Sequence, residues 1–244
     1  MRKMLAFANR TFKEILRDPL TMAFGLGFPV ILLLLLSLIQ SNIPVKMFEL
    51  HYLTPGITVF GLSFMTLFSA QLISKDRTSS LLTRLYTTPL KATDFIFGYL
   101  LPIIPLCLAQ TVICYVIALI LGLSFSVNVV WAVLMILVPS FLYIALGLLC
   151  GSAMTEKQVG GICGALLTNL SAWLSGIWFD ISMLGKVVNA IANALPFIHA
   201  VELERAVVLG DFSAALPHLI WVLAYGIVLM VIAVFVFLRQ MKKQ

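Results

Sequence analysis

Charged residues are scarce in this sequence. Of its 244 residues, 11% are Asp, Glu, Lys or Arg, whereas 61% are hydrophobic and the mean hydropathy is +1.09. A water-soluble globule of this length needs more polar surface than such a composition supplies. The scarcity of charge therefore excludes a soluble protein and predicts an all-α integral membrane protein.

Motifs for catalysis and for cofactor binding are also missing. None of the lysines is followed by Ser or Thr, so the chain lacks the GxxxxGK[ST] loop that holds nucleotide phosphates. It also lacks HExxH and GxSxG, and its four cysteines show no spacing typical of a metal site. We therefore expect no enzyme activity, no bound cofactor and no metal ion on this chain.

Long uncharged runs predict six transmembrane helices. A spanning helix needs about 20 apolar residues. Four runs hold one such helix each, and the run 95–155 holds two, divided at the turn-forming stretch 122–128. The expected spans are 20–40, 53–74, 96–121, 129–153, 158–178 and 216–238.

Basic residues predict the orientation. If both termini are cytoplasmic, 13 of the 16 Lys and Arg residues lie inside, and only Lys46, Lys186 and Arg205 lie outside. The net charge of +6 is thus explained by topology and gives no reason to expect a nucleic-acid partner. We expect a multi-pass protein of a bacterial inner (plasma) membrane.

The first 18 residues predict an amphipathic helix lying in the membrane interface. One arc of the helical wheel is apolar and the opposite side is basic, whereas Phe7 falls outside the apolar arc. The apolar arc consists of Met4, Leu5, Ala8, Phe12, Ile15 and Leu16. This elbow helix either anchors the chain or docks against a cytoplasmic partner.

No Asp, Glu, Lys or Arg falls in the middle of a predicted span. Carriers coupled to protons or ions generally need an ionisable group at membrane depth. We therefore expect any energy for active transport to enter through a partner protein.

The segment 75–95 differs from the rest of the chain because it is polar and basic. Its apolar residues between Ser80 and Leu90 have the spacing of a short amphipathic helix, which Thr87, Thr88 and Pro89 would end. The stretch 84–102, RLYTTPLKATDFIFGYLLP, resembles the corresponding stretch of the ABC-2 type permease family. The matching positions are Arg84, Leu85, Tyr86, Thr87, Thr88, Pro89 and Leu90, followed by Gly98, Leu100, Leu101 and Pro102.

The resemblance implies a function. Permeases of this family are the membrane subunits of ABC exporters, and this segment is their coupling helix, which contacts an ATP-binding cassette ATPase subunit. ATP and Mg²⁺ would be held by that partner, and a second permease chain would complete the path, as a homodimer by analogy with the family. The coupling residues would be Arg84, Leu85, Thr87, Thr88, Pro89, Leu90 and Lys91. Ser80 and Thr83 stand where the family usually has Gly and Glu.

The segment 180–215 predicts two short helices on either side of Pro196, on the outer side and before the last span. Its Leu-Pro-Phe-x-His stretch, which ends at His199, also resembles the family, where this element caps the outer exit. His199 and Glu202 lie one turn apart, but two ligands are too few to indicate a metal site.

Two GxxxG patterns predict close helix packing, and contacts within the chain are the simpler explanation for both. They are formed by Gly147 with Gly151 and by Gly160 with Gly164.

Two predicted spans carry stripes that would line the path by analogy with related exporters. Packing within the core is the default explanation for such stripes, but an aromatic wall with one amide and no charge would suit a hydrophobic or amphiphilic solute. The candidate path residues are Phe60, Phe64, Phe68, Asn169 and Trp173.

Two other functions remain open from the sequence. The chain would be a nucleotide-independent channel or carrier if it moved solute alone, and a membrane scaffold if it recruited a partner without transport.

Overall fold

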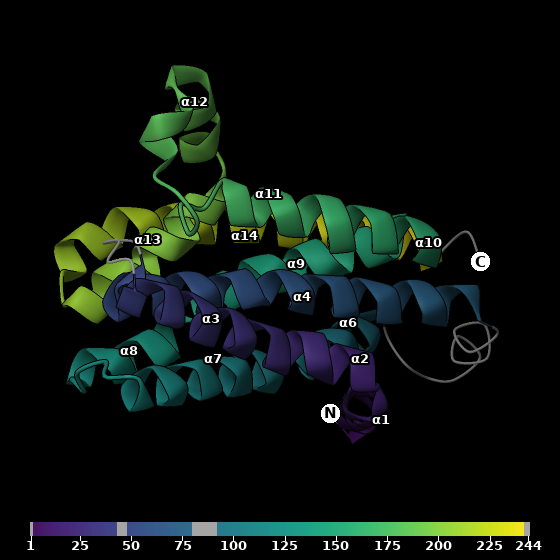
Figure 1. The fold of residues 1–244 in the computed structure, drawn as a ribbon. Helices are drawn as coiled ribbons and strands as arrows, with labels where there is room; N and C mark the ends of the chain where they lie inside the picture. Colours follow the sequence, from purple (N-terminus) through teal and green to yellow (C-terminus); the bar gives the residue numbers. More distant parts are fainter. Residues whose placement is uncertain (1, 43–47, 80–91, 242–244) are drawn as a thin grey trace.

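The computed structural model describes residues 2–42, 48–79 and 92–241, and in these ranges the chain forms helices joined by turns, without strands. Five helices in the described part are long and apolar enough to cross a membrane. They run side by side as a bundle (Figure 1). These helices are Pro19–Asn42, Leu50–Thr78, Ala92–Ile120, Val127–Ala153 and Phe212–Met241. The chain is thus an all-α, multi-pass membrane protein.

The helices follow one another with few long connections. In chain order they are α1 (Arg2–Arg17), α2 (Pro19–Met22), the π-helix η1 (Ala23–Gly27), α3 (Phe28–Asn42), α4 (Leu50–Thr78), α6 (Ala92–Leu100), α7 (Ile103–Ile120), α8 (Val127–Met135), α9 (Leu137–Ala153), α10 (Glu156–Val159), the π-helix η3 (Gly160–Leu167), α11 (Thr168–Trp173), the 3₁₀ helix η4 (Ile181–Leu184), α12 (Lys186–Ala194), α13 (Pro196–Leu209) and α14 (Phe212–Met241).

Prolines divide two of the long helices. Pro102 has no N–H to donate and follows the end of α6. Pro139 cannot donate to the carbonyl oxygen of Met135, which is where α8 ends. Between these helices the chain reverses at 121–126, where Gly122 has a φ of 110°.

The range 158–178 is occupied by a shorter helical stretch. It consists of α10, η3 and α11, and all three contact α4. Its first turn carries Glu156, Lys157 and Gln158, and the stretch is not among the five helices that qualify as spans. The sixth span stays a prediction.

Helix α4 forms the centre of the bundle. Its most apolar window is 89% buried. Several of its serines and threonines donate to backbone carbonyls, whereas the buried hydroxyls of Thr54 and Ser69 have no hydrogen-bond partner among the described residues. Thr58 donates to the carbonyl oxygen of Pro55 at 2.8 Å, and Thr66 donates to that of Tyr143 on α9 at 2.7 Å. The hydroxyls of Thr58 and Thr66 therefore have hydrogen-bond partners in this core without a bound solute or ion.

Glycines let α9 approach α4 closely. A Cβ at Gly147 would lie 2.9 Å from the Cβ of Ser69, and one at Gly151 would lie 2.8 Å from the carbonyl oxygen of Ala70. The first GxxxG pattern therefore packs within the chain, as expected. The second does not pack in the same way, because nothing lies within 4 Å of a Cβ at Gly160.

Arg205 ties α13 to the end of the bundle opposite α1. Its side chain is 8% exposed and donates to the carbonyl oxygens of Tyr52 (3.2 Å) and Gly176 (3.0 Å), and it pairs with Glu202 at 2.8 Å. Helix α12, by contrast, stands out from the bundle (Figure 1). The predicted outer segment thus contains one helix fixed to the bundle and one that projects from it.

We expect Gly151→Ala to lower the free energy of unfolding by about 1–3 kcal/mol, because the added methyl group meets the α4 backbone. The matched control Gly160→Ala places its methyl group in open space, so stability should stay level or rise by up to about 1 kcal/mol. Thermal denaturation in detergent measures both. Equal melting temperatures for the two variants would contradict the packing described here.

Candidate functional site

Phe7 attaches α1 to the bundle. Its ring makes edge contacts with Phe95 and Tyr99 of α6, at centroid distances of 5.5 and 5.0 Å. It also lies against Gly98, where a Cβ would collide with the ring. Phe7 is 6% exposed, whereas Leu5 is 55% exposed. Ala8 and Ile15 of the predicted arc are buried as well, so α1 docks through Phe7 together with part of that arc, while Leu5 and Leu16 stay exposed.

Asp76 joins α1, α4 and α6 at the same end of the bundle. It is 2% exposed. Arg10 donates to both of its carboxylate oxygens, from Nη1 at 2.6 Å and from Nη2 at 3.0 Å, and the Tyr99 hydroxyl donates to Oδ2 at 2.9 Å. Bidentate pairs of this kind are among the strongest hydrogen-bonded contacts in proteins.

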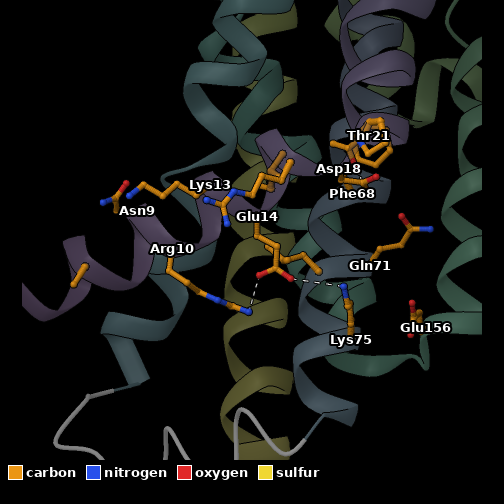
Figure 2. A pocket seen from close by; sticks show the side chains of 15 residues that line it. Asn9, Arg10, Lys13, Glu14, Asp18, Thr21, Phe68, Gln71, Lys75 and Glu156 are labelled. Carbon is orange, nitrogen blue, oxygen red and sulfur yellow. Dashed lines mark hydrogen bonds and ion pairs between the residues drawn. The ribbon is translucent and has the colours of Figure 1, made fainter.

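Glu14 extends this network to Lys75, the residue of α4 that precedes Asp76. It pairs with Arg10 at 2.6 Å and with Lys75 at 3.7 Å, as Figure 2 shows. Burial lowers the pKa of Arg10, but the hydrogen bond and charge of Asp76 outweigh this, so the pKa of the guanidinium lies above its usual value. We call these five residues, Arg10, Glu14, Lys75, Asp76 and Tyr99, the clamp.

Arg77 connects α4 to a further helix beside the clamp. Its Nη2 donates to the carbonyl oxygen of Met154, the residue after α9, at 2.9 Å. The last turn of α4 is thereby fixed to α1, α6 and the end of α9. This turn directly precedes the segment 80–91, so the chain enters that segment from a rigid base.

The predicted coupling residues lie outside the described residues. They are Arg84, Leu85, Thr87, Thr88, Pro89, Leu90 and Lys91. The structure describes the two helices that flank them, α4 up to Thr78 and α6 from Ala92. Their role stays a prediction.

The candidate path residues fall into two groups. Phe60, Phe64 and Phe68 are buried. Phe60 and Phe64 pack against the first span of the same chain, with Phe28–Phe60 and Phe24–Phe64 centroid distances of 6.5 and 6.2 Å.

The other two path candidates, Asn169 and Trp173, are exposed on α11. The Asn169 amide donates to the carbonyl oxygen of Ala165 at 2.7 Å, and Trp173 is 56% exposed. The five residues therefore do not form one continuous wall within this chain, and their role in a path stays a prediction.

The two residues considered as metal ligands have other partners. His199 lies 2.8 Å from His218, Nδ1 to Nδ1, and its Nε2 is 2.9 Å from the carbonyl oxygen of Asn193. Glu202 pairs with Arg205. Across the described ranges, no group of three or more His, Cys, Asp or Glu is placed to hold a metal ion.

The comparison with known families covers the clamp and all of the bundle except α14. The sequence model described as ABC-2 type transporter matches residues 2–209, from α1 to the end of α13. The chain belongs to the ABC-2 type transporter family. It is thus the permease subunit of such a transporter, and it transports rather than catalyses. Membrane proteins of the ABC-2 family work with an ATPase subunit. A search of curated proteins found no match to the chain.

Sequence reasoning missed one buried acidic residue of this permease, Glu204 on α13. Its carboxyl group is fully buried and has no hydrogen-bond partner among the residues that the structure describes, and burial raises its pKa well above the usual value. Tyr115 of α7 lies close enough to interact with it electrostatically. Burial therefore favours the protonated, neutral form of this carboxyl group in the folded protein.

We expect Asp76→Asn to lower the free energy of unfolding by about 1–3 kcal/mol, because Arg10 loses its charged partner. Arg10→Lys, which keeps the charge but cannot bind both oxygens, should lie between this variant and the wild type. Thr11 is fully buried on α1, and the four native cysteines are buried, with Cys150 the most exposed of them at 8%. Labelling of Thr11→Cys with a water-soluble maleimide should therefore rise when Asp76→Asn is added. Unchanged labelling would contradict a role of Asp76 in holding α1.

Glu204 predicts a dependence of stability on pH. The folded state keeps a proton that the unfolded chain releases above about pH 4.3, so stability falls as pH rises, by up to about 1.4 kcal/mol per unit, until the raised pKa is reached. Glu204→Gln should remove this fall and exceed the wild type in melting temperature at pH 7–8. Glu156→Gln, at an exposed glutamate, is the control. Parallel pH curves for wild type and Glu204→Gln would contradict the assignment.

Proposed function

We propose that this permease subunit is part of an ATP-driven exporter of hydrophobic or amphiphilic solutes. A separate ATPase subunit binds ATP and Mg²⁺, and this chain holds neither. The segment 80–91 docks on that subunit and passes its movement to the membrane helices. Two copies of the chain enclose the path.

The clamp is the observation that carries this proposal. It fixes the end of α4 to α1 and α6, about one helical turn before the segment 80–91 begins. Helix α4 is also the most buried of the five long helices. A displacement of the segment therefore acts on the central helix of the bundle and not on a loose loop.

The orientation rests on charge. The clamp end carries α1 and the last turn of α4, with Lys75 and Arg77, and Arg239 lies in the last turn of α14. Cationic ends favour the cytoplasmic side of a membrane. We place both termini in the cytoplasm and the chain in an inner (plasma) membrane.

The number of spans and the path are parts of the same proposal. The stretch from Glu156 to Trp173 runs beside α4, and we assign it as the fifth of six spans. Its exposed side carries Asn169 and Trp173, which would face the second copy across the path. Apolar and amide side chains without charge suit an apolar or amphiphilic solute.

The deciding experiment is gentle extraction of the tagged chain from its native membrane. A soluble subunit with a nucleotide-binding loop should co-purify in a 1:1 ratio, and Leu85→Glu with Leu90→Glu should remove it. The control, Leu85→Ile with Leu90→Ile, should retain it, because the hydrophobic anchors remain. Solute flux in liposomes without nucleotide would instead establish a solitary channel or carrier. Partner binding without any flux would establish a scaffold.

A further inference from the structure

A hollow of about 850 Å³ lies beside the clamp. Helix α1 forms one wall, α4 lies behind, and the first residue of α10 closes the other side (Figure 2). The hollow is at the level where α1 leads into the first span, so it opens at the membrane interface. Its lining mixes charged side chains with apolar ones.

Two cations on the α1 wall have no ion-pair partner in the part of the chain that the structure describes. Lys13 and Arg17 lie one helical turn apart and form no ion pair with any residue in the described part of the chain. Arg10 and Lys75 also line the hollow, but the clamp holds both. Lys13 and Arg17 are therefore the cations that remain available to a ligand.

One carboxylate remains available on the opposite side. Glu156, in the first turn of α10, has no ion pair within the described ranges. The other two acidic residues of the lining are engaged, since Glu14 belongs to the clamp and Asp18 accepts hydrogen bonds from Leu20 N (3.1 Å) and the Thr21 hydroxyl (2.7 Å). The lining of the hollow thus includes two cations of α1 and one carboxylate of α10 that form no ion pair within the described ranges.

Apolar side chains accompany these charges. Phe68 and Leu72 of α4 line the hollow. On α1 and α2, which border it, Leu16 and Leu20 are 44% and 66% exposed. Exposed leucines on an interfacial helix lie among acyl chains. The ligand that matches this surface has a charged head and an apolar tail.

We propose that the hollow binds the headgroup of a phospholipid that carries a phosphate and a primary ammonium, the phosphoethanolamine group. The phosphate lies between Lys13 and Arg17, and the ammonium donates to Glu156. The acyl chains lie over the exposed leucines of α1 and α2. The site is independent of solute export, because it requires only that the chain lies in a membrane.

Other headgroups satisfy fewer of these charges. A glycerol headgroup meets the two cations but leaves Glu156 without a counter-charge beside a phosphate. A choline headgroup has no N–H to donate to the carboxylate. The expected order of affinity is therefore phosphatidylethanolamine first, with phosphatidylglycerol and phosphatidylcholine both weaker.

Native mass spectrometry of the full chain in detergent, with the three lipids added in equal amounts, tests the site. Lys13→Gln with Arg17→Gln should weaken phosphatidylethanolamine binding at least tenfold. The control Lys157→Gln with Arg239→Gln removes two cations from the same end of the bundle, outside this lining, and should bind as the wild type does. Glu156→Gln should abolish the preference for phosphatidylethanolamine over phosphatidylglycerol.

Three results would overturn the proposal. The first is equal loss of lipid in the Lys13/Arg17 and Lys157/Arg239 variants, which would indicate a diffuse charge effect. The second is an unchanged lipid preference in Glu156→Gln, an exposed position whose substitution leaves the core intact. The third is displacement of the lipid by soluble phosphoethanolamine at equal concentration, which would identify a free phosphate compound as the ligand.

Discussion

The carboxylate of Asp76 is buried where α1, α4 and α6 meet. The arrangement of these helices depends on the hydrogen-bond donors and the positive charge that this carboxylate requires. An ionised group that is 2% exposed is costly unless hydrogen bonds and an opposite charge compensate it. Arg10 and Tyr99 supply both. Because they come from α1 and α6, satisfying one carboxylate fixes two further helices, and Phe7 against Gly98 completes the same contact with apolar atoms.

Helix α4 is held at its two ends by arginines and along its middle by close packing. Arg205 reaches the carbonyl oxygen of Tyr52 at one end, and Arg10 reaches Asp76 at the other. Between them, α9 approaches through Gly147 and Gly151. The charged contacts of α4 thus lie toward its ends, where water is nearer and desolvation costs less free energy. Its apolar middle is held by close packing of the helix backbones.

Composition and run length predicted an all-helical membrane protein, and the stretch 84–102 indicated its family, because both signals are local. The clamp was not predictable in this way, since Arg10 and Asp76 are 66 residues apart and periodicity carries no information on such pairs. A single apolar arc also misjudged Phe7. Helix α1 faces two apolar environments, the bilayer and α6, and a helical wheel assumes one. Gly98 was noticed by resemblance, and its physical reason is the ring that lies against it.

The order in which the contacts of α1 become available has a consequence for biogenesis. The ribosome makes α1 first, at roughly 5–20 residues per second, so Phe7 and Arg10 exist several seconds before Gly98 and Asp76 emerge. During that interval α1 has no protein partner. Its exposed leucines bind it to the membrane surface during this interval. It packs against the bundle only when α4 and α6 have been inserted. The part of the apolar arc that stays exposed after docking, Leu5 and Leu16, thus keeps α1 at the membrane surface until its partners in the chain have been made.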